Sequence, residues 1–205
     1  MSRSFVVIVP VKPPSVGKSR LDVLGSSVRA QLAAAFALDT VLAALGAADV
    51  AAVVVACDEP AVVAAVSGLG CRVVPDAGGL NETLVAAAAL VRDQLPDAHP
   101  VALCADLPAL RSAELHDALG RLPTDRAAFV ADASGTGTTT YAAPYDGFTP
   151  GFGPASRARH VAAGALELPG AMPGLRRDVD DPADLEAAEA LGVGPHTAAV
   201  LARWA

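Results

Sequence analysis

Short apolar runs that suit buried strands recur along the chain. Residues 5–11 form a near-continuous apolar, β-branched run, which is typical of a strand buried on both faces of a sheet. Comparable runs predict further strands at residues 51–57, 71–75, 100–105 and 127–132. Two more short strands are predicted at residues 138–143 and 175–179.

Helical signals fill the stretches between these runs. The longest predicted helix covers residues 27–45, which Ser26 or Ser27 can cap and Gly46 ends. Four of its apolar residues are spaced i, i+3, i+4, i+7 and are expected to face the sheet: Leu38, Val41, Leu42 and Leu45. Further helices are predicted at residues 60–66, 111–122 and 195–204. Three more are predicted by one end only: one ends near residue 94, one begins at residue 156 and one ends near residue 191. Alternation of strand and helix predicts an α/β fold with a mostly parallel sheet and helices on both faces.

Residues 133–154 break this alternation. The segment ASGTGTTTYAAPYDGFTPGFGP contains a threonine run, a short strand and a loop rich in proline, glycine and aromatic residues. A departure of this kind from the strand–helix repeat predicts an inserted hairpin or lid around a small ligand.

Length and composition place limits on the architecture. The chain has 205 residues, of which 53% are hydrophobic and 18% charged, so we expect one compact domain over residues 1–205. The net charge of −7 argues against nonspecific binding to nucleic acid. An anionic ligand must therefore be held by local cations or by metal ions.

The three cysteines indicate a reducing compartment. Cys57, Cys71 and Cys104 are widely separated and form no C-x-x-C pair, so neither a zinc site nor a disulfide framework is indicated. We find no secretory signal and expect no stretch able to span a membrane, because charged residues interrupt the apolar ones. These features predict a cytoplasmic protein. The sequence does not decide whether it forms a homo-oligomer.

A basic loop follows the first strand. It carries Lys12, Lys18 and Arg20, with Gly17 allowing close backbone approach, and phosphates commonly bind where a first buried strand leads into a helix. The alternative is a solvated surface loop. Gly17-Lys18-Ser19 looks like the end of a P-loop, but that pattern requires glycine where Lys12 stands. The loop still fits a nucleoside triphosphate held mainly by side-chain cations.

Acidic residues at strand ends suggest a metal site. Asp106 follows a predicted central strand, where open α/β sheets bind ligands, although a lone aspartate there is also a common turn residue. Asp181 is a good N-cap for the next helix, whereas capping explains neither Asp178 nor Asp180. The latter two alternate on a predicted strand and so share one face. Clustered carboxylates suit Mg²⁺, which shares oxygen ligands with phosphates and would assist transfer at phosphorus.

Two glycine-containing turns complete the candidate ligand-binding segments. Gly79 and Asn81 follow the third strand, although Asn81 can instead be an ordinary N-cap. Gly153 and Ser156 can place backbone and hydroxyl donors on an anion, or simply begin a capped helix.

Taken together, the motifs resemble a known family. The segments PVKxxxxxKSRL, GGLNETL, ADLPAL, GTGTTTYAAP, FGPASRARH and LRRDVDDPADL occur in the order found in the guanylyltransferases of deazaflavin coenzyme biosynthesis, which act on phosphoenolpyruvate or 2-phospho-L-lactate. That family resembles the molybdopterin-cofactor guanylyltransferases and has a GT-A-like, Rossmann-like nucleotidyltransferase fold. The chain lacks the LAGG opening of those relatives, so its base pocket is expected to differ.

The resemblance implies a role for each candidate residue. Thr138, Gly153 and Ser156 match positions that bind the three-carbon phosphoacid, and 133–154 becomes the acceptor-binding insertion. GTP is expected at the following positions: Lys12, Lys18, Gly79 and Asn81. The metal-binding acids correspond to Asp106, Asp178 and Asp180. Lys18 and Asp106 are the two residues expected to take part in the chemistry.

The sequence therefore predicts a Mg²⁺-dependent guanylyltransferase that transfers GMP from GTP to phosphoenolpyruvate and releases pyrophosphate. The choice of phosphoenolpyruvate over 2-phospho-L-lactate follows from motif spelling and arginine-rich composition, not from a residue that distinguishes the two acids. A non-catalytic nucleotide-binding domain of the same fold is the alternative from another class, and the three aspartates argue against it.

Overall fold

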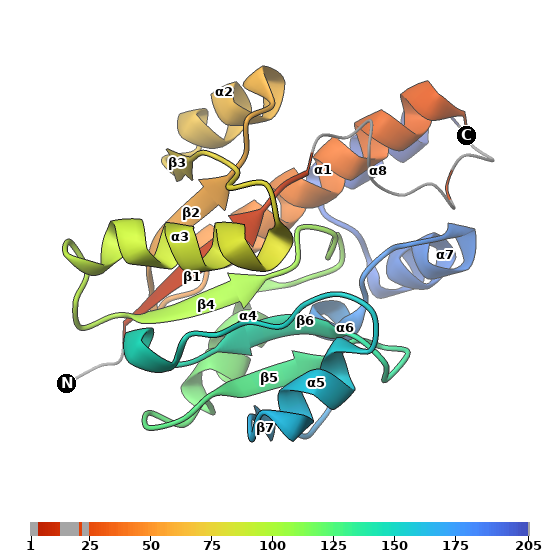
Figure 1. The fold of residues 1–205 in the computed structure, drawn as a ribbon. Coiled ribbons are helices and arrows are strands. Elements are labelled where there is room, and N and C mark those ends of the chain that lie inside the picture. The colour runs from red at the N-terminus through yellow and green to blue at the C-terminus, as the bar shows by residue number, and fades with distance from the viewer. Residues whose placement is uncertain (1–3, 13–20, 22–24, 205) are drawn as a thin grey trace.

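The centre of the molecule is a mixed sheet of seven strands. A computed structural model describes residues 4–12, 21 and 25–204, and Figure 1 shows their arrangement. The strand order is β3-β2-β1-β4-β6-β5-β7. The strands are β1 (Phe5–Pro10), β2 (Val50–Ala56), β3 (Arg72–Val74), β4 (His99–Leu103), β5 (Ala128–Ala131), β6 (Thr138–Ala142) and β7 (Leu166–Glu167).

Strand direction determines which chain segments meet at one edge of the sheet. β1 runs parallel to β2 and β4, and β2 runs parallel to β3. β6 is antiparallel to both β4 and β5. The carboxyl ends of β1, β3 and β4 therefore lie at the same edge as the start of β6. The hairpin predicted from residues 133–154 contributes β6 as an interior strand between β4 and β5.

Helices cover both faces of this sheet, as predicted. α3 crosses one face, whereas α1, α2 and α4 pack on the other (Figure 1). The helices are α1 (Ser26–Leu45), α2 (Pro60–Gly68), α3 (Leu80–Arg92), α4 (Ser112–Gly120), α5 (Ser156–Ala162), α6 (Pro173–Arg176), α7 (Pro182–Leu191) and α8 (Pro195–Trp204). A single 3₁₀ turn, Tyr145–Gly147, lies between β6 and α5.

The first strand shows why its apolar run is continuous. Val6 and Ile8 belong to the hydrophobic cluster beneath α3, whereas Val7 and Val9 belong to the cluster beneath α1 and α4. All four are fully buried. Since successive side chains of a strand point to opposite faces, a strand covered on both sides must be apolar at every position.

α1 joins the sheet to the C-terminal helices. Its outer side packs with α8 and α7 in a third apolar cluster that includes Leu32, Phe36 and Val200. By length and composition α1 could cross a membrane, which the sequence prediction did not foresee, but half of its apolar window is buried inside the protein. We therefore interpret α1 as a core helix.

The structure corrects several local predictions. Residues 175–179 are not a strand, because α6 occupies Pro173–Arg176 and irregular backbone follows. α1 begins after Gly25, and neither Ser26 nor Ser27 caps it. Leu45, expected to face the sheet, is 36% exposed. β7 and α6 were not predicted.

Candidate active site

The edge where β1, β3 and β4 end and β6 begins contains many of the predicted site residues. Lys12 lies just beyond β1, and Gly79 follows β3 at the start of α3. Asp106 follows β4, and Thr138 is the first residue of β6. Lys18 lies outside the described residues. This edge is where open α/β sheets bind ligands.

Asp106 is held by main-chain contacts on both sides. Thr40, fully buried on α1, accepts a hydrogen bond from the Leu107 N–H at 3.1 Å. Its one hydroxyl hydrogen is shared between the Phe36 carbonyl at 2.8 Å and the Ala105 carbonyl at 3.3 Å. The carbonyl of Asp106 itself accepts the Val179 N–H at 3.1 Å. Sequence reasoning missed Thr40, because a lone threonine within a helix gives no signal of its role.

The bond between Val179 and Asp106 places the segment that carries Asp178 and Asp180 beside the end of β4. Val179 is fully buried, Asp178 is half-buried and Asp180 is exposed. The Asp180 N–H donates to the Asp184 carboxylate at 3.2 Å, and Arg177 pairs with the same carboxylate at 3.0 Å. The two acids thus flank a buried anchor on irregular backbone and not, as predicted, on a strand.

The carboxylates of Asp106, Asp178 and Asp180 do not by themselves form a complete metal-binding site in the described structure. Within the described part of the chain, no group of three or more His, Cys, Asp and Glu side chains is arranged to hold a metal ion. Mg²⁺ usually takes one or two protein carboxylates together with substrate phosphates and water. The donor type therefore fits Mg²⁺, provided that phosphate oxygens complete the coordination.

Lys12 is paired in this structure. Its ammonium lies 3.2 Å from the Asp76 carboxylate, which also accepts hydrogen bonds from the Thr83 hydroxyl at 2.6 Å and the Gly78 N–H at 2.9 Å. The Thr83 bond first, and then Gly78 and Lys12, keep the pKa of Asp76 below its usual range. A phosphate that binds Lys12 must compete with an ionised Asp76, a residue the sequence reading did not name.

Asn81 connects the two sides of the edge. Its side-chain amide accepts from the Phe152 N–H at 2.8 Å and donates to the Phe152 carbonyl at 3.1 Å. Gly79, not Asn81, is the N-cap residue of α3, so the capping interpretation of Asn81 is wrong. Asn81 ties the start of α3 to the loop that precedes α5.

The main chain of the loop before α5 is held by hydrogen bonds from a side chain of α5. Arg159 donates from one guanidinium to the carbonyls of Gly151, Phe152 and Pro154 at 2.8–3.1 Å. Gly153 has φ of +120°, a conformation that L side chains rarely adopt. The Ser156 N–H donates to the Gly153 carbonyl at 3.1 Å, so the hydroxyl of buried Ser156 is its remaining donor toward a ligand.

His160 lies behind Thr138 and was not assigned a role from the sequence. One ring nitrogen, Nδ1, is 3.0 Å from the Thr138 hydroxyl, and the other, Nε2, accepts the Gly151 N–H at 2.9 Å. The ring is 2% exposed. Burial first, and then the charge of Arg159, lower the pKa of His160 to about 4, so the ring is neutral near pH 7.

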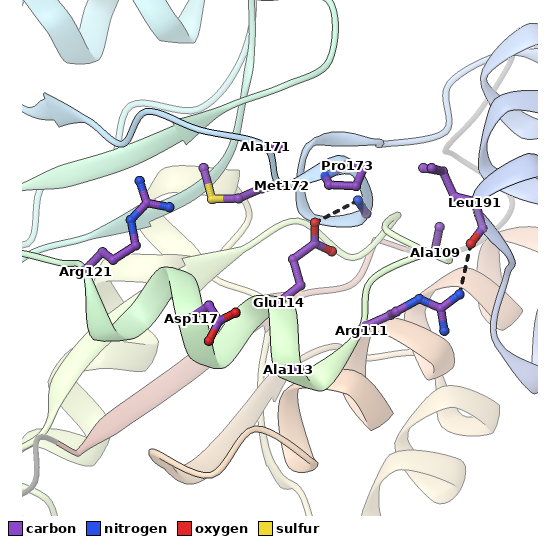
Figure 2. Close-up of a pocket in the computed structure, with 11 residues that line it drawn as sticks. Ala109, Arg111, Ala113, Glu114, Asp117, Arg121, Ala171, Met172, Pro173 and Leu191 are labelled. Carbon is purple, nitrogen blue, oxygen red and sulfur yellow. Dashed lines mark hydrogen bonds between the residues drawn. The ribbon is translucent and has the colours of Figure 1, made fainter.

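A separate cavity of about 630 Å³ lies between α4 and residues 171–174, which lead into and begin α6. Figure 2 shows its lining, which includes none of the predicted site residues. Its charged groups contact the surrounding chain: Glu114 accepts the Gly174 N–H at 3.1 Å, and Arg111 donates to the Leu191 carbonyl at 3.0 Å. We therefore assign a structural role to the polar residues that line this cavity, because Glu114 of α4 holds Gly174 of α6.

Gly174 should be intolerant of a side chain. A Cβ there would collide with the Ala109 carbonyl and the Glu114 carboxylate, so Gly174→Ala is expected to lower the free energy of unfolding by about 1–3 kcal/mol. The matched control is Gly120→Ala at the end of α4, where a Cβ meets nothing within 4 Å. It should be neutral or stabilising by up to about 1 kcal/mol. Urea unfolding measures both, and equal effects would contradict the collision.

Comparison with known proteins identifies relatives of the whole chain. Residues 5–166 match the family model described as "Guanylyl transferase CofC like". A protein of Thermomonospora curvata named phosphoenolpyruvate guanylyltransferase is 52% identical over 204 residues, covering 98% of this chain and 90% of its own. A protein of Streptomyces scabiei with the same name is 50% identical over 208 residues, covering 97% and 96%.

Solved structures show the same fold at low identity. A nucleotidyl transferase from Methanothermobacter has a TM-score of 0.61 at 17% identity and covers 92% of this chain and 97% of its own. A Mycobacterium tuberculosis protein described as a complex with manganese has a TM-score of 0.54 at 19% identity, covering 92% and 98%.

Proposed function

Since the chain belongs to the CofC-like guanylyl transferase family, we propose that it transfers GMP from GTP to phosphoenolpyruvate and releases pyrophosphate. The observation that carries this proposal is the near full-length match to curated relatives of that name. The chain is a nucleotidyltransferase, which removes the non-catalytic binding domain from consideration.

We assign the acceptor to the side of this sheet edge that is formed by β6 and the loop before α5. The Thr138 and Ser156 hydroxyls are donors suited to a carboxylate or phosphate, and Gly153, with φ of +120°, lies in the loop that leads to Ser156. The rigidity of the loop supports this assignment, since Arg159 and Asn81 already fix its carbonyls and amides. A preorganised site loses less entropy when the acceptor binds.

GTP is assigned to the side formed by β1 and α3. Lys12, just beyond β1, and Gly79, at the start of α3, both lie on this side of the sheet edge. Lys18 remains a prediction from the sequence alone. Asn81, also predicted to contact GTP, is assigned a supporting role here, because both polar atoms of its amide are engaged by Phe152. A triphosphate would displace Asp76 from Lys12 and exchange one anionic partner for another.

Mg²⁺ is the cofactor we propose, held by Asp106, Asp178 and Asp180 together with phosphate oxygens of the two substrates. When bound, it would neutralise charge on the α-phosphate and on the leaving pyrophosphate. The protein carries a net charge of −7, so two polyanionic substrates require local cations to approach one another.

The chemistry needs no strong general base. An oxygen of the acceptor phosphate, already ionised near neutral pH, attacks the α-phosphorus of GTP. The bond from that phosphorus to the bridging oxygen breaks, and the electron pair leaves with pyrophosphate. The residues of the chain position the two phosphates and stabilise the charge that develops during transfer.

We further propose that the enzyme acts in the cytoplasm as one catalytic domain over residues 1–205, with residues 133–154 as the acceptor-binding insertion. The three cysteines support this compartment, because all are free thiols and two of them, Cys71 and Cys104, are only half-buried.

The test is a pyrophosphate-release assay with a matrix of nucleotides and phosphoacids. GTP with phosphoenolpyruvate is expected to give the highest turnover. Equal amounts of phosphoenolpyruvate and 2-phospho-L-lactate should then compete, with the product identified by mass. A dominant lactyl product, two hydrogens heavier, would overturn the choice of acceptor but not the guanylyl transfer. Absence of pyrophosphate release with both acids would refute the proposed function.

A further inference from the structure

His160 is enclosed by aromatic rings contributed by three segments. It stacks on Tyr141 of β6 with ring centroids 4.8 Å apart and an interplanar angle of 26°. Phe129 of β5 lies at 5.3 Å, and Phe152 meets the ring edge-on at 5.8 Å. Such packing fixes the plane of the imidazole, so its two nitrogens point in set directions.

The partners of the two nitrogens determine which one carries the proton. A backbone N–H can only donate, so Nε2, which faces the Gly151 N–H, must be the unprotonated nitrogen of a neutral ring. Nδ1 therefore carries the hydrogen. It faces the Thr138 hydroxyl, so His160 donates and the hydroxyl oxygen accepts.

This arrangement determines what the Thr138 hydroxyl can do. A hydroxyl has one hydrogen to donate, and here it cannot donate it to the ring, which already presents an N–H. Within the described part of the chain the hydroxyl has no second partner. Its hydrogen is thus available to an acceptor at the sheet edge, and an anionic oxygen is the acceptor that gains most.

We propose that His160 is a positioning residue for the acceptor: it forces the Thr138 hydroxyl to act as a hydrogen-bond donor to a carboxylate or phosphate oxygen of the phosphoacid. Through Nε2 the same ring holds Gly151, two residues before Gly153, so one imidazole contacts both Thr138 of β6 and the loop before α5. The inference rests on the proposed function for the identity of the acceptor.

Two amide substitutions separate the two contacts. His160→Asn can return an N–H near the position of Nδ1, whereas His160→Gln can return an acceptor near the position of Nε2 but loses the donor to Thr138. We expect His160→Gln to raise the KM for phosphoenolpyruvate about tenfold, the loss of roughly one hydrogen bond to an anion, with the KM for GTP unchanged. His160→Asn should raise it less.

A double-mutant cycle tests whether His160 acts through Thr138. Thr138→Val should raise the KM for the phosphoacid by at least as much as His160→Gln, and the double variant should be no worse than Thr138→Val alone. Multiplying effects, or equal rises in the KM of both substrates, would overturn the proposal in favour of a merely structural histidine. Thr138→Ser, which keeps the hydroxyl, is the matched control.

A measurement without substrate separates this inference from the proposed function. The ¹⁵N spectrum of the wild-type imidazole should show the Nδ1–H tautomer at pH 6–7, and an Nε2–H tautomer or an imidazolium ion would overturn the inference. If wild-type protein releases no pyrophosphate from GTP and either phosphoacid, the proposed function fails, and the tautomer still decides whether His160 orients Thr138.

Discussion

Replacement of Asp180 by asparagine is expected to lower the turnover of pyrophosphate release by about 10²-fold or more without unfolding the protein. Asp180 is exposed, and its backbone N–H, which the substitution keeps, makes the bond to Asp184. The change removes one negative charge from the proposed metal site and leaves the volume of the side chain nearly the same.

The adjacent residue provides a matched control. Asp181 caps α7, accepting the N–H groups of Ala183 and Asp184 at 2.9 and 3.0 Å. Asp181→Asn is the same chemical change one position along, and asparagine is an equally good cap, so activity and stability should stay near wild type. Turnover should be measured at saturating Mg²⁺. If Asp180→Asn then retains near wild-type turnover, Asp180 is not a metal ligand.

The largest expected loss of stability comes from Asp39→Ala. Asp39 lies on α1, is 4% exposed, and accepts the N–H groups of His196 at 3.0 Å and Thr197 at 2.8 Å. A carboxylate on one helix thus caps the first turn of another. Alanine would leave these donors without an acceptor in a buried site, so we expect the free energy of unfolding to fall by about 3 kcal/mol.

Urea unfolding followed by circular dichroism measures this loss. Asp49→Ala is the comparison, because Asp49 is partly exposed and pairs with half-exposed His116, an arrangement worth no more than about 1 kcal/mol. Similar losses for the two variants would show that the cap of α8 contributes little.

Local pattern was enough to predict most of the regular structure. The strands from Phe5–Pro10 to Ala128–Ala131 follow apolar runs whose burial is decided by the residues themselves. The prediction was wrong at residues 175–179, where Leu175 and Val179 suggested a strand. There the backbone is set by contacts from elsewhere: Glu114 of α4 accepts the Gly174 N–H, and Arg176 donates to the carbonyls of Ala131 and Leu168.

The same distinction applies to the candidate site. Residues that follow strands, such as Lys12 and Asp106, could be named from their positions, because parallel strands end at a common edge. The supporting residues could not. Asn81 bonds Phe152, which lies 71 positions along the chain, and Thr40 bonds Leu107, which lies 67 positions along. No local pattern reports a partner that distant. His160 was passed over as well, although its partners Thr138 and Gly151 lie only 22 and 9 positions away.

The cap that Asp39 places on α8 also orders events during synthesis. Its two donors are translated 157 and 158 positions after it, later than every strand of the sheet. Until then a nascent chain exposes the side of α1 that later packs on α8, and the Asp39 carboxylate lacks its native partners. An exposed apolar helix face of this kind is what chaperones bind. The outer side of α1 is covered only after α8 has been synthesised. We therefore expect ribosome-bound fragments that end before residue 195 to be the forms of this chain that most need protection from aggregation.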